Sequence, residues 1–165
     1  ASTTSASTTT APSTGGTAPA PGLPHGRDVT VTSITDGDTF RAGDERVRLI
    51  GIDTPEVAHE GTSERPGNAA ECFGPEASTF TTDLLPVGTP VRLERDVVGR
   101  DDYGRLLAYV YRASDAIFVN YELARQGYAE PLSIAPNVAF RDLIVDAARL
   151  AERDGAGLWA ACRGQ

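Results

Sequence analysis

The order of apolar and polar residues predicts that the chain begins with short strands. Residues 29–34 alternate with a period of two, which is typical of a strand with one buried face. A turn at Asp36-Gly37 leads to a second strand that starts at 39–41, and Gly43-Asp44 leads to a third at 47–52. Three strands joined by tight turns predict a curled meander.

Helical patterns follow a loop over residues 57–73 that has no apolar period, and a loop of this length in a compact domain is usually functional or mobile. Pro75 and Glu76 suit the first turn of a helix. The apolar stripe of this helix contains Ala77, Phe80 and Leu84.

The second half of the chain predicts two more strands, 89–96 and 105–112, and a short helix over 120–126 that Gly127 ends. A last helix is predicted over about 138–153. Its apolar face holds Phe140, Leu143, Ile144, Ala147, Leu150 and Ala151. Five short strands with three helices indicate the α+β class, and a small five-stranded β-barrel covered by helices is the expected architecture because closure removes the sheet edges.

Composition divides the chain into two parts. Residues 1–26 are rich in Ser, Thr, Ala and Pro, and they bury too little apolar surface to offset the entropy of ordering, so a disordered tether is expected. Residues 27–165 form the predicted domain. No apolar run approaches the ~20 residues of a membrane helix. A Ser/Thr/Pro-rich stalk is typical of exported proteins, so we expect a secreted protein, free or tethered to the cell surface.

Cys72 and Cys162 are the only cysteines. Export and the carboxy-terminal position of Cys162 favour a disulfide between them, which would close a loop of about 90 residues and contribute about 4 to 5 kcal/mol in the loop-entropy model. Two buried free thiols are the alternative.

The net charge of −8 argues against tight general adhesion to nucleic acid. All 15 basic residues are arginines, which together with the many Ala and Gly residues indicates a coding bias. The acidic excess is local, since residues 36–64 hold eight acids and three arginines. A cation bound there would offset part of this charge.

Asp38 and Asp53 stand in turns at strand ends. Carboxylates from two loops, without cysteine or histidine beside them, suit a hard cation, and calcium is the expected ion outside the cell. Taken singly, each residue also fits an ordinary role, Asp38 in a hairpin turn and Asp53 as a strand terminator.

Two arginines and a glutamate complete the candidate chemistry. Arg48 and Arg105 have the side chain best shaped to hold phosphate oxygens, although each also fits a solvated position on a strand. Glu56 follows Asp53 closely and is placed to orient or deprotonate a water, although a surface glutamate is the alternative. His59 is a further candidate base, but a lone histidine in a polar loop is more often solvated.

Five segments, in this order, resemble the staphylococcal (micrococcal) nuclease family. They are residues 36–39 (DGDT), 48–56 (RLIGIDTPE), 74–77 (GPEA), 102–105 (DYGR) with 107–109 (LAY), and 123–127 (LARQG). The resemblance covers nearly all of the chain from Val29 to Trp159. It implies an OB-fold barrel with three helices and calcium-dependent endonuclease cleavage of DNA and RNA, single strands preferred, at the 5′ oxygen–phosphorus bond to leave 3′-phosphates.

The resemblance also implies roles for single residues. Asp38 and Asp53 match calcium carboxylates, and Thr54 would add its backbone carbonyl. Arg48 and Arg105 match the arginines that hold the scissile phosphate, and Glu56 matches the general base. Tyr103 resembles a tyrosine that touches the terminal phosphate of the nucleotide. A monomer is expected.

The chain departs from the best-known member, which is basic and lysine-rich. Asp102 falls where that member has a lysine beside the nucleotide, and Ser133 where it has a substrate-facing tyrosine. The loop at 57–73 is longer, and the cysteines have no counterpart. These departures predict a weaker hold on nucleic acid. Two other hypotheses remain open, a non-catalytic nucleic-acid-binding module and a calcium-binding structural domain.

Overall fold

The computed structural model describes residues 22–58 and 70–164. Its largest element is a six-stranded sheet with the strand order β1-β6-β7-β4-β3-β2. The strands are β1 (Arg27–Thr30), β2 (Ser33–Asp36), β3 (Thr39–Ala42), β4 (Glu45–Leu49), β6 (Pro90–Glu94) and β7 (Leu106–Arg112). All pairs are antiparallel except β4 with β7.

The two edges of this sheet are halves of one bent segment. The single strand predicted over 29–34 was wrong, because the chain changes partners at Val31 and Thr32. The amide of Val31 donates to Thr89 beside β6 (3.0 Å), whereas the amide of Thr32 donates to Arg41 in β3 (2.8 Å). Counting β1 and β2 as one strand gives the five-stranded barrel of the α+β, OB-like fold that the sequence predicts.

The third predicted strand, 47–52, is also divided. β4 ends at Leu49, and β5 (Gly51–Asp53) leaves the barrel to pair with β8 (Glu130–Leu132), a strand that the sequence analysis missed. Gly51 has a φ of 84°, and a Cβ there would lie 2.7 Å from the Cδ1 of Ile144, so glycine permits both the bend and the close approach of a helix. The bend carries Asp53 away from the barrel wall.

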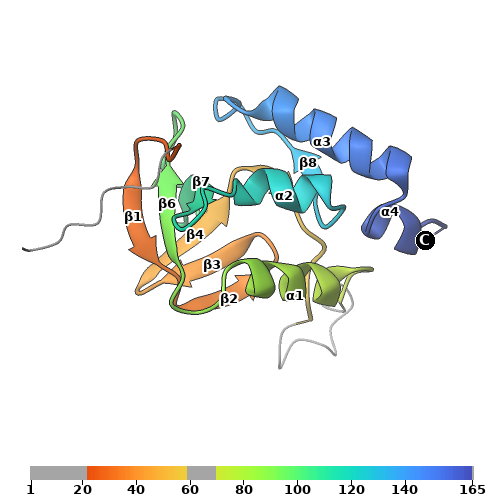
Figure 1. Cartoon of the computed structure of the whole chain (residues 1–165), viewed down its shortest axis with the longest axis horizontal. Coiled ribbons are helices and arrows are strands. Elements are labelled where there is room, and N and C mark those ends of the chain that lie inside the picture. The colour runs from red at the N-terminus through yellow and green to blue at the C-terminus, as the bar shows by residue number, and fades with distance from the viewer. Residues whose placement is uncertain (1–21, 59–69, 165) are drawn as a thin grey trace, which may run out of the picture.

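In the described part of the chain, four helices lie beside the barrel, to its right in Figure 1. They are α1 (Gly74–Leu84), α2 (Val119–Arg125), α3 (Arg141–Asp154) and α4 (Leu158–Ala161). The first three correspond to the predicted helices, while α4 was not predicted. Pro75 occupies the first turn of α1 as expected, and Gly155 ends α3 in the left-handed conformation (φ 62°).

The last long helix begins at Arg141 rather than at about 138. The residues just before the helix make other contacts, since the amide of Ala139 donates to the carboxylate of Asp96 (3.0 Å). Leu143, predicted on the apolar face, is 46% exposed, whereas Ile144, Ala147 and Ala151 are buried. The buried stripe of α3 is therefore narrower than the pattern indicated.

The core fills the barrel and the seam between the barrel and the helices. Phe40, Leu49, Ile52, Tyr109 and Leu123 are each at most 1% exposed. Burying each of the aliphatic or aromatic groups contributes about 1.5–3 kcal/mol. This core holds the strand ends in fixed positions, which the polar cavity described below requires.

Some predictions fall outside the described residues. They include residues 1–21 of the predicted tether, and residues 59–69 of the long loop with His59. In the described ranges, no helix combines the length and the apolar character needed to cross a membrane.

Cys72 and Cys162 form a disulfide, the pairing that the sequence favours. Cys72 precedes α1 and Cys162 follows α4, so the bond links two segments that are 90 residues apart in sequence. The amino end of α1 and the carboxyl end of α4 both lie at the right of Figure 1.

Replacing both cysteines by alanine should lower the free energy of unfolding by about 4 kcal/mol, because the unfolded chain regains the entropy of an open loop. Urea unfolding followed by circular dichroism measures this change. The free energy of unfolding of this variant should match that of the wild-type protein measured in a reducing agent. A loss below about 1 kcal/mol would contradict the prediction.

Candidate active site

A polar cavity of about 130 Å³ lies where the barrel meets β5. Every residue that lines it is acidic, basic or a threonine. They are Asp36, Asp38, Thr39, Arg48, Asp53, Thr54, Glu56 and Arg105. The set contains all of the predicted catalytic and metal-binding residues, which the sequence scatters from position 38 to position 105.

Strand pairing brings these residues together. Antiparallel β3–β4 pairing sets Thr39 opposite Arg48, which places the preceding turn beside that arginine. Parallel β4–β7 pairing sets Arg48 opposite Leu107, two residues after Arg105. Arg48 lies in β4 and Arg105 directly precedes the neighbouring strand β7, so both arginines reach the same cavity.

The carboxylate of Asp38 connects three segments. Its Oδ1 accepts from the hydroxyl of Thr39 (2.9 Å), and its Oδ2 accepts from the amide of Thr54 (3.0 Å). The same oxygen lies 3.3 Å from Nη2 of Arg48, and the side chain of Asp38 is only 9% exposed. Asp38 is thus a buried, ion-paired group that also fixes the start of the segment after β5.

The turn that carries Asp38 is fastened to a helix as well. The hydroxyl of Thr81 in α1 donates to the carbonyl of Gly37 (2.6 Å). A Cβ at Gly37 would lie 2.8 Å from the hydroxyl oxygen of Thr54, so glycine lets the turn and the segment after β5 approach closely.

Arg48 is held by main-chain oxygens and by two acids. Its Nη1 donates to the carbonyls of Leu49 (2.6 Å) and Ile52 (2.8 Å), and its Nη2 donates to Asp53 (2.9 Å). The side chain is 12% exposed. These contacts fix the guanidinium plane between the two carboxylates.

Asp53 differs from Asp38 in its surroundings, because its side chain is 59% exposed. Partial burial raises the pKa of Asp53, the negative charge of Asp38 raises it further, and Arg48 opposes both. The charges of Glu71 and Glu56 also raise the pKa of Asp53, although burial is the largest cause. A bound cation would relieve this repulsion.

Arg105 is oriented by Asp101. Its Nε donates to Asp101 (2.7 Å), whose other oxygen accepts from the amides of Tyr103 and Arg105. Burial alone would raise the pKa of Asp101, but these hydrogen bonds lower it. Within the part of the chain that the structure describes, the terminal nitrogens of Arg105 donate to no protein group.

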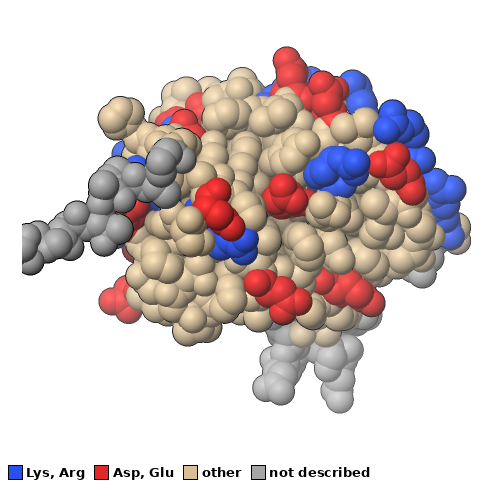
Figure 2. Space-filling model, viewed as in Figure 1, with Lys and Arg blue, Asp and Glu red and all other residues tan. Residues whose placement is uncertain are grey.

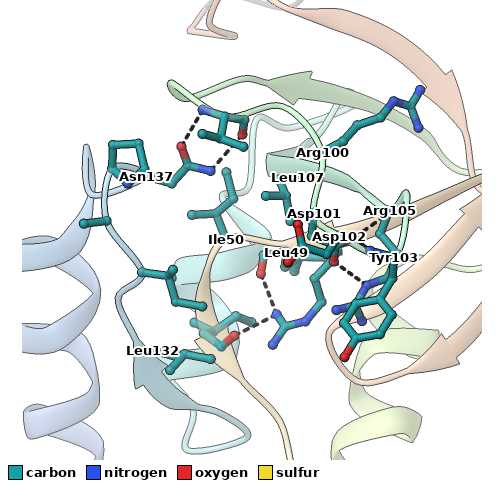
Figure 3. A pocket seen from close by; sticks show the side chains of 17 residues that line it. Leu49, Ile50, Arg100, Asp101, Asp102, Tyr103, Arg105, Leu107, Leu132 and Asn137 are labelled. Atoms are coloured by element: carbon teal, nitrogen blue, oxygen red, sulfur yellow. Dashed lines mark hydrogen bonds and ion pairs between the residues drawn. The ribbon is translucent and has the colours of Figure 1, made fainter.

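A second cavity, of about 400 Å³, adjoins the first and shares Arg48 and Arg105 with it. Figure 3 shows the aliphatic side chains of Ile50 and Leu132 on one side of it and the aromatic ring of Tyr103 on the other. Tyr103 is 75% exposed, and its ring centre lies 5.4 Å from the guanidinium carbon of Arg105. Tyr103 therefore borders the larger cavity and does not line the polar one.

Asp36, Glu71 and Asp101 contribute to this site without having been predicted from the sequence. Asp36 lines the polar cavity, and the DGDT segment that holds it was the available signal. Glu71 raises the pKa of Asp53 through its charge, although it stands in a segment without any pattern. Asp101 orients Arg105 four residues away. The roles assigned to the gathered residues remain predictions.

The donor atoms of the polar cavity suit a hard cation. The hydroxyl of Thr54 is buried and has no hydrogen-bond partner among the described residues. Apart from the two arginines, the side chains that line the cavity are carboxylates and threonine hydroxyls, and their oxygens are the ligands that hard cations prefer. Residues 22–58 and 70–164 contain no cluster of three or more His, Cys, Asp or Glu side chains arranged to hold a metal.

Charge on the rest of the surface is mixed. Figure 2 shows acidic side chains scattered over this face and arginines gathered at the edge formed by α3 and α4. Arg149 and Arg153 on α3 are 74% and 71% exposed, and each pairs with an acid. No single basic face is visible in this view.

Comparison with known proteins places this cavity in context. The family model described as staphylococcal nuclease homologue matches residues 46–161. The chain is 39% identical over 138 residues to a thermonuclease of Staphylococcus intermedius, covering 81% of this chain and 77% of that protein. It is 34% identical over 134 residues to a thermonuclease of Staphylococcus hyicus, covering 79% and 74%. It is also 32% identical over 139 residues to an SPbeta prophage-derived endonuclease of Bacillus subtilis, covering 81% and 44%.

Replacing Asp38 by alanine should lower the free energy of unfolding by about 2–4 kcal/mol, because the amide of Thr54 and a largely buried arginine lose their partner. Asp53→Ala is the matched control. Its carboxylate is mostly exposed, so the loss should stay below about 1 kcal/mol. Urea unfolding measures both, and equal losses would contradict the structural role of Asp38.

Proposed function

This chain belongs to the staphylococcal nuclease family, and from that premise we propose that it is a calcium-dependent endonuclease that hydrolyses phosphodiester bonds of DNA and RNA. One observation carries the proposal, the convergence of the predicted acids and arginines on a single cavity. The names of the relatives, two thermonucleases and an endonuclease, support polynucleotide as the substrate.

The two arginines would hold the scissile phosphate. Both border the polar cavity and the larger one, so a phosphate between them has the acids on one side and room for a base on the other. Arg105 keeps its terminal nitrogens available while Asp101 fixes its Nε. Arg48 would exchange part of its bonding with Asp53 for phosphate oxygens. Charge that builds on the phosphorus oxygens in the transition state would be stabilised by both guanidinium groups.

Asp38, Asp53 and the carbonyl of Thr54 would hold calcium. The buried Thr54 hydroxyl and the raised pKa of Asp53 support this assignment. When bound, the ion would supply positive charge close to the phosphate oxygens. Asp38 keeps its position without a metal, since Thr54, Thr39 and Arg48 already fix it.

Glu56 would act as the general base. Its side chain is exposed and borders the cavity, so a water can lie between it and the phosphate. Removal of the water's proton would produce the nucleophile for in-line attack. The 5′ oxygen would leave on the opposite side, so that the product ends in a 3′-phosphate.

The setting of the enzyme is part of the proposal. The disulfide supports an oxidising compartment, hence secretion, and the Ser/Thr-rich segment 1–26 would serve as a tether to the cell surface or as a free stalk. We propose that the folded domain spans 27–165 and acts as a monomer, with single strands preferred, because two adjoining cavities suit an unpaired nucleotide.

A non-catalytic nucleic-acid-binding module is the main alternative. The complete set of acids and arginines favours the enzyme, because binding alone does not need Glu56.

Calcium should raise the melting temperature and be required for cleavage of single-stranded DNA and RNA. Binding only to the folded state stabilises by about 2.7 kcal/mol at a hundredfold excess over the dissociation constant. A chelator should abolish both effects, and fresh calcium should restore them. Cleavage at full rate in chelator would reject calcium dependence.

Arg48→Ala and Glu56→Gln should each lower kcat about 10²–10⁴-fold, because one removes phosphate stabilisation and the other the base. Oligonucleotide cleavage at saturating calcium measures this. Arg41→Ala and Glu76→Gln, exposed changes of the same chemical kind, should retain wild-type kcat. If Glu56→Gln cleaved normally, its assignment as base would fall.

A further inference from the structure

The turn that precedes α1 holds the main chain of Glu56. The amide of Glu56 donates to Oε2 of Glu71 (3.0 Å), and the carbonyl of Glu56 accepts from the amide of Glu71 (2.9 Å). Glu71 is the only hydrogen-bond partner of these two main-chain groups among the described residues. The backbone position of Glu56 therefore depends on a residue 15 positions away.

Steric contact reinforces this hold. A Cβ at Gly74 would lie 2.1 Å from the carbonyl oxygen of Glu56, so only glycine allows the turn to approach so closely. The amide of Gly74 donates to the carbonyl of Glu71 (3.0 Å), which closes the turn on itself. Residues 71–74, hereafter the clamp turn, thus contact Glu56 from two sides.

The disulfide lies inside the clamp turn. Cys72 directly follows Glu71, and its bond to Cys162 attaches the turn to the end of α4. Phe73, the next residue, stacks on Tyr128 with 5.3 Å between ring centres.

The other cysteine of the disulfide, Cys162, follows α4, and main-chain contacts hold this helix in place. The amide of Leu158 in α4 donates to the carbonyl of Gly127 (2.8 Å), and a Cβ at Gly157 would lie 2.2 Å from that same oxygen. α4 therefore packs against the segment that joins α2 to β8. Through Cys162, this rigid part of the molecule fixes the clamp turn.

We propose that the Cys72–Cys162 disulfide sets the catalytic rate by positioning Glu56 through the clamp turn. The inference rests on the proposed role of Glu56 as the base. A dithiol reductant would donate two electrons and two protons, become a disulfide itself and leave Cys72 and Cys162 as thiols. The clamp turn then loses its attachment to α4, and Glu56 loses its fixed distance from the cavity.

The consequence is a nuclease whose activity follows the redox state of its surroundings. General-base catalysis contributes about 10²–10⁴-fold, and a displacement of ~1 Å can cost about 10²-fold. Opening the disulfide should therefore lower kcat about 10–100-fold while the barrel remains folded. The enzyme would be least active in a reducing compartment and most active in an oxidising one.

The test compares wild type with Cys72→Ala/Cys162→Ala, each with Glu56 intact and with Glu56→Gln. Oligonucleotide cleavage at saturating calcium is measured at a temperature where circular dichroism shows every variant folded. The cysteine replacement should lower kcat 10–100-fold with Glu56 present, change KM less than about threefold, and cost nothing further with Glu56→Gln. An unchanged kcat, or an equal loss in both backgrounds, would overturn the proposal.

Two controls separate positioning from stability. Leu123→Ala removes a buried side chain from α2 and leaves the disulfide intact, so this destabilised variant should keep wild-type kcat at the same temperature. Glu71→Ala removes the side-chain acceptor and should lower kcat as the cysteine variant does, whereas Glu71→Gln retains an acceptor and should restore most of the rate. Loss of rate in Leu123→Ala equal to that of the cysteine variant would overturn the proposal.

Amide hydrogen exchange gives a readout that does not need activity. Exchange of the Glu56 amide should accelerate at least tenfold without the disulfide, and it should remain faster than exchange of the amide of Val47, a buried residue of β4 that opens only with global unfolding. If wild type failed to cleave polynucleotide, the proposed function would fall and the catalytic role of the bond with it, even with accelerated exchange. If wild type cleaved and the Glu56 amide exchanged at the same rate in both forms, the positioning role alone would be overturned.

Discussion

Three separate segments meet at the buried carboxylate of Asp38, and the rest of the polar cavity depends on that meeting. The turn between β2 and β3 carries it, the segment after β5 donates an amide to it, and Arg48 of β4 pairs with it. A buried carboxylate is stable only with such partners. The barrel core supplies the fixed strand ends that keep these partners within hydrogen-bonding distance.

The same interaction explains how two acids and two arginines coexist in a small space. Arg48 stands between Asp38 and Asp53, so each acid has a positive neighbour. Asp101 pairs with the Nε of Arg105, and the terminal nitrogens of this arginine are left to face the cavity. Burial, and then the charge of Asp38, raise the pKa of Asp53, which is the more exposed acid and the one that an ion from solvent can reach.

Much of this could be predicted from the sequence because local signals mark it. Pro75 marks the start of α1, and the Asp-Gly turn marks the position of Asp38. The change of partner at Val31 could not be predicted, since a period of two shows which face is buried but not which strand lies alongside. The pairing of β8 with β5 and the hydrogen bonds between Glu71 and Glu56 depend on contacts between distant segments. Such contacts produce no periodic pattern in the sequence.

The pair of cysteines also constrains how the molecule matures. A chain with two cysteines has one possible internal pairing, so oxidation produces no miswired isomers and needs no shuffling enzyme. The second sulfur is synthesised 90 residues after the first. The bond can therefore close only after all the strands of the barrel have been synthesised, because Cys162 follows them in the sequence.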